Sequence, residues 1–308
     1  MAFASHHWPT WGKDRIVTYL SEQRDLYAYL HDQTLRLLNQ GHTGIEIAEM
    51  IELPTALQNS WHTHGYYGSV SHNVKAIYQY YLGWFDGNPA HLWELPPSES
   101  GKRYVDCMGG ADATVAKARE YVDAGDRRFA AQLLNHVVFG YPEHTGAKEL
   151  LAEVYQRLGY GAENGTWRNF YLTGAQELRH GIRANAAAIS SAGMAVALTV
   201  EQILDSLAIR VVGPKASSVQ LSIDLTVTDV GETHHLTLSN GALIHYPSPD
   251  SAATPPADLA LTLSKAQLLG LLAGHGLDGI AVVGDPATLP RLLGVLDSPD
   301  PSFAIVTP

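Results

Sequence analysis

The spacing of apolar residues divides the chain into a helical part and a part built on strands. Between Lys13 and about Ala192, apolar residues recur every three or four positions, which predicts amphipathic helices. Asp14 can cap the first of these helices, whose apolar stripe comprises Ile16, Tyr19, Leu20, Leu26, Leu30, Thr34 and Leu37 before Gly41. Further helices are expected at residues 44–52, 55–61, 70–84, 112–124, 127–140, 144–158 and 167–192. Gly-Asn-Pro at 87–89 and Pro96-Pro97 are expected to interrupt them.

After about residue 197, apolar residues recur at every second position. Val219, Leu221, Ile223, Leu225 and Val227 alternate with polar residues, as in a half-buried strand. Further strands are expected at 236–238, 243–246 and 259–263, with a hairpin turn at Ser239-Asn240-Gly241 and a loop at 247–256. Helices are expected at 199–207, at 264–273 with Ser264 as cap, and at 286–296 with Pro286 near its first turn. This α+β pattern fits either a lipophilic cavity or a solid core.

A repeat lies within the helical part. Ala118 and Ala152, Tyr121 and Tyr155, and Gly125 and Gly159 are each 34 residues apart. With Pro142 closing the second helix, this spacing is typical of a tetratricopeptide-like hairpin. Because fewer than about three such repeats cannot bury a core alone, a packing or dimerisation surface is favoured over a peptide receptor.

Length and charge narrow the function classes. The 308 residues suggest about two domains. No run of roughly 18 apolar residues predicts a membrane span, and the first twenty residues lack a signal-peptide pattern. A single cysteine, Cys107, excludes an internal disulfide. A net charge of −11 disfavours nucleic acid. Residues 44–54 resemble the start of a helix-turn-helix, but Glu46, Glu49 and Glu52 there would repel phosphates.

Residues 66–89 are unusually rich in aromatic side chains. Their tyrosine hydroxyls, together with Asn73 and Lys75, could offer hydrogen bonds to a negatively charged oxygen. The alternative is an aromatic-rich buried helix.

The fifteen histidines invite metal hypotheses. His6 and His7 precede Trp8-Pro9 where an opening strand, without a partner strand nearby in the sequence, passes into a loop. His62 and His64 could point the same way on an extended segment, whereas neighbouring histidines at 234–235 would face opposite sides of a strand. A solvent-exposed or hydrogen-bonded histidine is the alternative for each pair. No Gly-x-Ser-x-Gly, Gly-x-x-x-x-Gly-Lys or His-Glu-x-x-His motif occurs, so no catalytic residue is assigned.

Several segments, in order, closely resemble the class III alkyl sulfatases. They are residues 3–12 (Phe-Ala-Ser-His-His-Trp-Pro-Thr-Trp-Gly), 23–34, 66–89, 109–112 (Gly-Gly-Ala-Asp), 133–136 (Leu-Leu-Asn-His) and 167–178. The resemblance implies a metallo-β-lactamase-fold, zinc-dependent enzyme that hydrolyses alkyl sulfate esters such as dodecyl sulfate to alcohol and sulfate. It covers essentially the whole chain.

The resemblance also implies a domain order. Residues 1–40 correspond to the C-terminal remnant of a metallo-β-lactamase-like domain, and residues 41–180 to an all-α helical dimerisation domain. Residues 190–308 correspond to an α+β, sterol-carrier-like domain that would present an apolar surface to an alkyl chain. A homodimer and an alkyl sulfate or other alkyl-chain ligand are the implied partners.

By the same resemblance, His7, or less favourably His6, corresponds to a ligand of a binuclear zinc site. Tyr80, or less favourably Tyr81, would hold the sulfate group. The family's His-x-His-x-Asp-His motif is absent from this sequence and is expected to precede residue 1. The alternative function is a stand-alone dimeric lipid- or surfactant-binding module without catalysis. The compartment is left open.

We expect the purified 308-residue chain to release no sulfate from dodecyl sulfate. Two metal ions that activate water need roughly six or seven protein ligands, and His6 and His7 cannot supply them. A sulfate-release assay with added zinc checks this, and hydrolysis above the uncatalysed rate would contradict it.

Overall fold

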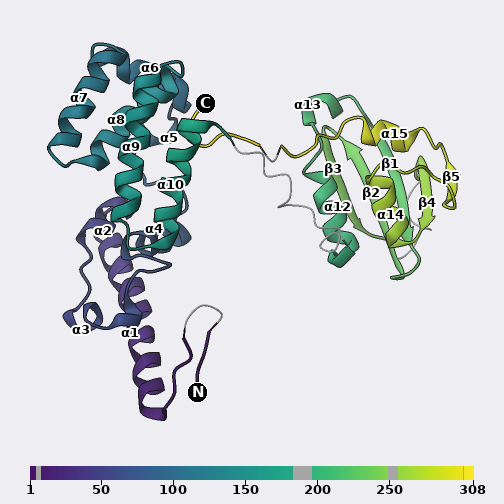
Figure 1. The fold of residues 1–308 in the computed structure, drawn as a ribbon. Helices are drawn as coiled ribbons and strands as arrows, with labels where there is room; N and C mark the ends of the chain where they lie inside the picture. The colour runs from purple at the N-terminus through teal and green to yellow at the C-terminus, as the bar shows by residue number, and fades with distance from the viewer. Residues whose placement is uncertain (5–7, 183–195, 249–255, 301) are drawn as a thin grey trace. The chain divides into compact units, whose positions relative to one another are not determined.

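A computed structural model describes residues 1–4, 8–182, 196–248, 256–300 and 302–308. The chain forms two compact units (Figure 1). The first comprises Met1–Arg183 together with Ala304–Pro308, and the second comprises Ala184–Phe303. The first unit is helical and the second contains a five-stranded sheet, which confirms the helical and α+β parts predicted from the two apolar periods. No helix in the described ranges is long and apolar enough to cross a membrane.

The first helices surround a small apolar cluster. Helix α1 (Lys13–Leu38) buries Leu26, Leu30, Thr34 and Leu37, the C-terminal half of the predicted stripe. Its N-cap is Gly12 at a φ of 89° instead of Asp14, which lies in the first turn without capping it. Helix α2 (Gly44–Met50) and helix α4 (Val70–Leu82) complete the cluster, which consists of Leu26, Leu30, Leu37, Ile47, Leu57, Val74 and Tyr78.

A second cluster forms among α6 (Pro97–Cys107), α7 (Ala111–Asp123), α8 (Arg127–Gly140), α9 (Thr145–Gly161) and α10 (Gly165–His180). Helix α6 and the short α5 (Pro89–Leu92) were not predicted, because their prolines suggested interruptions. Pro97 and Pro89 in fact open these helices, at a position whose N–H has no partner within the helix. The predicted helix at 55–61 is replaced by α3 (Thr55–Gln58) and a 3₁₀ turn, η1 (Trp61–Thr63).

The predicted repeat is only partly reflected in the helices. Ala118 of α7 and Ala152 of α9 are both fully buried. Gly125, however, follows α7 at a φ of 89°, whereas Gly159 lies within α9, where a Cβ would approach Leu172 of α10 to 3.1 Å. The helix predicted to reach residue 192 ends at His180, because Gly181 turns the backbone at a φ of 71°. The rest of that range lies largely outside the described residues.

The backbones of α6 and α8 approach each other closely where the two helices cross. A Cβ on Gly101 would lie 2.6 Å from the His136 carbonyl oxygen, and a Cβ on Gly140 would lie 2.5 Å from the Lys102 nitrogen. Both glycines are therefore required by the closeness of the two backbones. At the N-terminus, Ala2 pairs with Thr10 in an isolated antiparallel bridge, so the opening strand does have a nearby partner.

The second unit is a five-stranded sheet in the order β3-β2-β1-β4-β5, covered by helices (Figure 1). The strands are β1 (Leu221–Val227), β2 (Glu232–Ser239), β3 (Ala242–Pro247), β4 (Leu259–Leu263) and β5 (Ala281–Gly284). Only β1 and β4 run parallel. The predicted hairpin turn is confirmed, with positive φ angles at Asn240 and Gly241.

The helices of this unit are α12 (Val200–Ala208), α13 (Gly213–Ala216), α14 (Lys265–Leu272) and α15 (Thr288–Leu293). Thr199 and Ser264 cap α12 and α14, the latter as predicted. Helix α15 is shorter than predicted, since it begins after Ala287, and Pro286 lies outside it. The short β5 and α13 were not predicted because each spans only four residues.

The C-terminal tail returns to the first unit. The backbone nitrogens of Ile305 and Val306 each donate to Glu177 Oε1 of α10 at 2.9 Å, and the Thr307 hydroxyl approaches the same oxygen at 3.4 Å. Val306 packs on the second apolar cluster beside Gly174. One carboxylate oxygen thus holds three donors of the tail.

We predict that Glu177→Ala releases this tail. Loss of a charged acceptor shared by several donors costs about 1–3 kcal/mol locally, so amide exchange at Ile305 and Val306 should accelerate about tenfold or more. Glu177→Gln keeps an acceptor oxygen and should show a smaller effect. Hydrogen exchange resolved by residue checks both variants, and unchanged exchange in Glu177→Ala would contradict the prediction.

Candidate functional site

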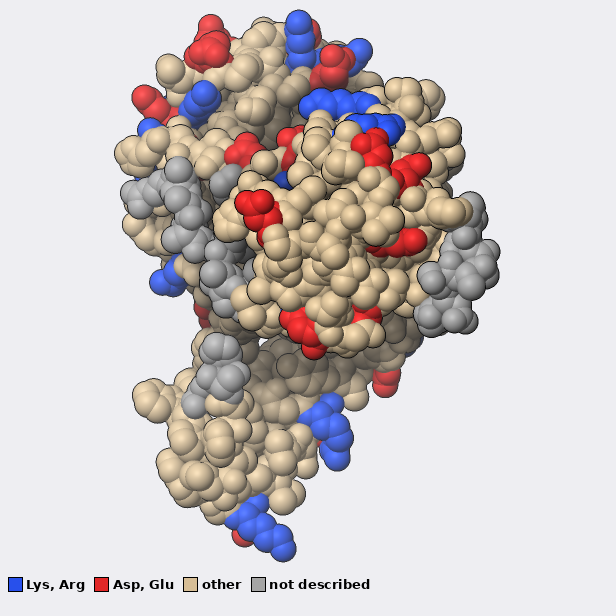
Figure 2. Space-filling model, turned by 90° about the vertical axis from the view of Figure 1, so that its right-hand side faces the viewer, with Lys and Arg blue, Asp and Glu red and all other residues tan. Residues whose placement is uncertain are grey.

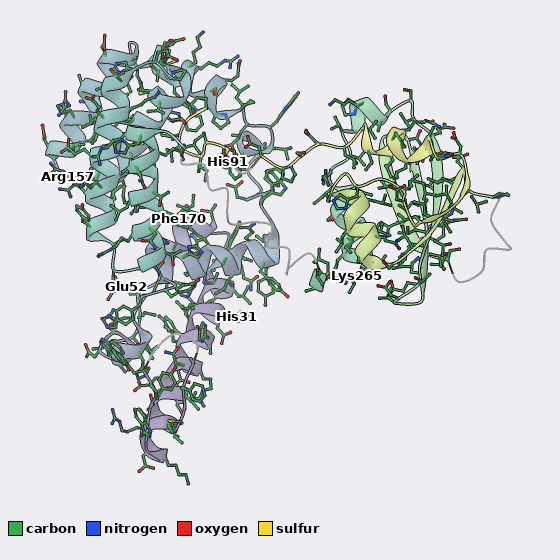
Figure 3. The ribbon with its side chains drawn as sticks, turned by 45° about the vertical axis from the view of Figure 1, so that its right-hand side comes forward. His31, Glu52, His91, Arg157, Phe170 and Lys265 are labelled. Atoms are coloured by element: carbon green, nitrogen blue, oxygen red, sulfur yellow. The ribbon has the colours of Figure 1, made fainter. Side chains whose placement is uncertain are left out.

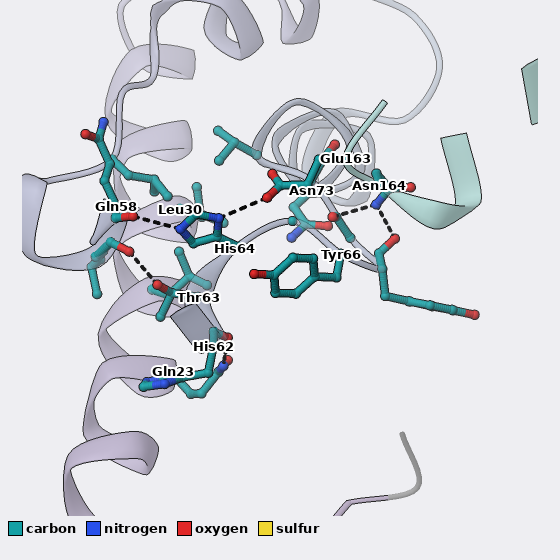
Figure 4. Close-up of a pocket in the computed structure, with 18 of the residues that line it drawn as sticks. Gln23, Leu30, Gln58, His62, Thr63, His64, Tyr66, Asn73, Glu163 and Asn164 are labelled. Atoms are coloured by element: carbon teal, nitrogen blue, oxygen red, sulfur yellow. Dashed lines mark hydrogen bonds and ion pairs between the residues drawn. The ribbon is translucent and has the colours of Figure 1, made fainter. Parts of the chain in front are cut away.

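The candidate site is a recess of about 940 Å³ in the first unit, which we call the aromatic recess (Figure 4). Its walls come from α1, from residues 57–69, from the start of α4 and from the turn between α9 and α10. Its lining is rich in aromatic rings, which come from α1 (Tyr19 and Tyr27), the loop (Tyr66 and Tyr67) and α10 (Trp167). The site thus joins segments about a hundred residues apart in the sequence.

Asn164 fixes the loop that forms one wall. Its side chain belongs to a residue only 4% exposed. The amide nitrogen donates to the carbonyl oxygens of Tyr67 and Gly68, the latter at 2.6 Å, and Oδ1 accepts from the Trp167 nitrogen at 2.7 Å. The same amide therefore caps α10 and holds the loop, so helix start and loop position depend on one residue. The Gly165 nitrogen adds a bond to the Tyr66 carbonyl at 2.8 Å.

His64 bridges two other walls. Its Nδ1 lies 3.0 Å from Glu163 Oε1 and its Nε2 lies 2.8 Å from the Gln58 carbonyl oxygen (Figure 4). Both partners accept hydrogen bonds, so the arrangement suits an imidazolium with two N–H donors. Accordingly, the pKa of His64 is raised, chiefly by the bond to Glu163 and then by the Gln58 carbonyl.

His62 and His64 do not form a shared metal site. The 3₁₀ turn replaces the expected extended segment, and His62 Nε2 instead pairs with Glu22 of α1 at 2.7 Å. In the part of the chain that the structure describes, no three His, Cys, Asp or Glu side chains gather closely enough to hold a metal ion. His6 and His7 lie outside the described residues.

The aromatic segment serves several purposes at once. Tyr78 is buried in the first apolar cluster, and burial raises its pKa. Asn73 lines the aromatic recess, whereas Lys75 lies 5.8 Å from the Trp167 ring centre and lines a different recess. Successive helical positions point in different directions, so these groups do not form one oxyanion-binding surface. The alternative, an aromatic-rich buried helix, holds for Tyr78 but not for Tyr80, which is exposed.

The two candidate sulfate-binding tyrosines lie near the end of α4, and neither lines the aromatic recess. Tyr80 is 83% exposed, and its ring meets Tyr81 edge-on at 5.1 Å. The Tyr81 hydroxyl is 2.8 Å from His31 Nε2 of α1 (His31 is labelled in Figure 3). Tyr81 is therefore held in place, and Tyr80 projects toward solvent.

The paired histidines of β2 have structural partners. His234 Nε2 lies 3.0 Å from Glu232, and His235 Nδ1 lies 2.6 Å from Asp224 on β1. Both histidines are buried, and each contacts its own carboxylate. They are therefore hydrogen-bonded histidines and do not share a metal site. 

The network of His64, Glu163 and Asn164 was not predicted from the sequence. Its members are separated by about a hundred positions, and the only local signal is an asparagine three residues before Trp167, which is compatible with an N-cap.

Comparison with known proteins identifies both units. A family model described as alkyl sulfatase dimerisation matches residues 43–181, and one described as alkyl sulfatase C-terminal matches residues 188–308. A linear primary-alkylsulfatase of Pseudomonas sp. is 43% identical over 99% of this chain and 46% of its own length. An alkyl/aryl-sulfatase of Saccharomyces cerevisiae is 41% identical over 99% of this chain and 48% of its own length.

A solved structure agrees. The stereoselective inverting sec-alkylsulfatase of Pseudomonas sp. superposes with a TM-score of 0.91 at 41% identity, over 98% of this chain and 48% of that protein. The chain spans about half the length of the curated relatives it matches. Through its dimerisation domain and its C-terminal domain, the chain belongs to the alkyl sulfatase family.

Proposed function

We propose that this chain supplies the dimerisation and alkyl-chain-binding parts of an enzyme that hydrolyses alkyl sulfate esters of the dodecyl sulfate type to alcohol and sulfate. The observation that carries the proposal is the continuous similarity, 41–43% identity over 98–99% of the chain, to alkylsulfatases. A dimeric lipid- or surfactant-binding module without catalysis is the second candidate. It is compatible with the matches to the dimerisation and C-terminal domain models, which cover residues 43–181 and 188–308.

Zinc would be the metal of the proposed enzyme, with His7 preferred over His6 as a ligand within the site of a metallo-β-lactamase-like domain whose C-terminal remnant is residues 1–40. When bound, zinc would activate water and polarise the sulfate ester. The described residues do not fit a complete zinc site, since no three suitable donors converge there.

Tyr80 is the better candidate for the sulfate group. Its exposed hydroxyl makes no hydrogen bond with a described residue, so its O–H can donate to a sulfate oxygen. Tyr81 instead contacts His31, which limits it to orienting Tyr80 through the edge-on ring contact.

The second unit would act as a sterol-carrier-like domain that grips the alkyl chain. Each buried methylene contributes about 0.8 kcal/mol, so even a partial apolar surface holds a long chain well. Two exposed apolar residues of the edge strand β3, Ile244 and Tyr246, offer such a surface.

A homodimer is the proposed assembly. The helical unit exposes large apolar side chains on α9 and α10, including Tyr160 and Phe170 (Phe170 is labelled in Figure 3), and such surfaces mark protein interfaces.

We expect the purified protein at micromolar concentration to sediment as a dimer, with twice the molecular mass of one chain. Phe170→Asp places a charge on the apolar face of α10 and should shift the equilibrium toward the monomer if that face takes part. Sedimentation velocity measures both. A wild-type chain that sediments only as a monomer would contradict the homodimer.

We further expect Tyr80→Phe to weaken binding of octyl sulfate by about five- to tenfold, because a hydrogen bond to a charged group contributes about 1.5–3 kcal/mol when shielded and less when exposed. The matched control is Tyr104→Phe, another exposed tyrosine, on α6. Calorimetric titration gives the affinities. Equal affinities in the two variants would remove Tyr80 from the site, and no binding to the wild type would count against the proposed function.

A further inference from the structure

A second recess of about 1050 Å³ lies beside the aromatic recess, and we call it the basic recess. Its lining includes four basic side chains, Lys75, Arg127, Arg128 and Arg157, and two acidic ones, Glu49 and Asp126. This excess of positive charge occurs in a chain whose net charge is −11. Figure 2 shows acidic and basic side chains both scattered over the face that it draws.

Two of the four cations are already neutralised. Arg128 forms a two-pronged contact with Glu49, at 2.9 and 3.2 Å, which lowers the pKa of Glu49. Arg157, labelled in Figure 3, pairs with Glu153 one turn earlier on α9 at 2.6 Å.

The other two cations form no close ion pair among the described residues, although Lys75 lies near enough to Glu49 to help lower the pKa of that carboxylate. The Nε atom of Arg127 is buried without a hydrogen-bond partner, and the rest of its side chain forms no ion pair. Lys75 only faces the Trp167 ring, at 5.8 Å. A buried guanidinium N–H without an acceptor costs about 1–3 kcal/mol, more when charged, so this pair is suited to receive an anion.

Neutral polar groups complete the lining. Ser71 of α4, together with Gln132 and Asn135 of α8, can donate to oxygen atoms that the two cations do not reach. His136 of α8 also lines the recess, and burial lowers its pKa, so it is neutral in the empty recess at neutral pH.

We propose that the basic recess binds a small tetrahedral dianion, inorganic sulfate or phosphate, between Arg127 and Lys75. A guanidinium presents paired N–H donors that match two oxygens of such an ion, and the ammonium group supplies the second charge. Arg127 and Lys75 supply two positive charges for the ion, while the Asp126 carboxylate also lines the recess. The site is separate from Tyr80 and Tyr81, which do not line this recess, and it does not depend on the proposed hydrolysis.

The test titrates the full chain with sodium sulfate and sodium phosphate at constant ionic strength and follows the imidazole resonances of His136 by NMR. Bound dianion should shift these resonances saturably and raise the pKa of His136, because a nearby negative charge favours the imidazolium. Parallel titrations with sodium chloride and methyl sulfate distinguish a free dianion from a sulfate-ester head group.

Arg127→Gln should weaken sulfate binding by about tenfold or more, as expected when a charge-assisted bond of about 1.5–3 kcal/mol is lost. Arg103→Gln is the matched control, since Arg103 pairs with Glu99 on α6 and does not line the recess. Thermal unfolding verifies that each variant is folded, and the wild-type NMR titration stands independently of them.

Three results would overturn the proposal. They are the absence of saturable shifts at His136 with either dianion, equal loss of binding in Arg127→Gln and Arg103→Gln, and binding of methyl sulfate as tight as that of free sulfate. Failure of octyl sulfate to bind would affect only the proposed function.

Discussion

The helical unit depends on a polar joint between two apolar clusters. One cluster lies among α1, α2 and α4 and the other among α6 to α10, and each is closed by its own buried side chains. Asn164 joins the loop before α4 to the first turn of α10 with three hydrogen bonds from a nearly buried amide. Because an unsatisfied buried amide is costly, this geometry is far more specific than apolar packing alone. The Arg128–Glu49 pair makes a second link between the clusters.

Both recesses follow from that joint. Ala162 and Trp167 line the aromatic recess and the basic recess alike, so the start of α10 forms a wall between them. On one side, the aromatic recess has a lining that combines the charged groups of His64 and Glu163 with tyrosine rings. On the other side Lys75 and the arginines of α8 and α9 create a positive one. A single helix start, fixed by one asparagine, thus separates two chemically different environments.

Much of the fold could be predicted from local patterns, and most of the site could not. The stripe from Leu26 to Leu37 and the alternation along β1 were visible because burial repeats with the period of the element. Pro97 was misinterpreted because the same residue stops one helix and starts another. His64 and Glu163 are 99 positions apart, and no local period connects them. The order of motifs gave the family, but Tyr80 and Tyr81 were placed by resemblance alone.

The tail on Glu177 gives the chain an unusual path, since it leaves the helical unit after α10 and comes back to it at Ala304–Pro308. The sheet-containing unit is therefore an insertion, anchored at both ends to the same neighbour. Mechanical force applied at Pro308 would first load α10 instead of the sheet. For the same reason, a reporter protein fused after Pro308 would travel with the helices, and it would reveal little about the motions of the domain that precedes it in the sequence.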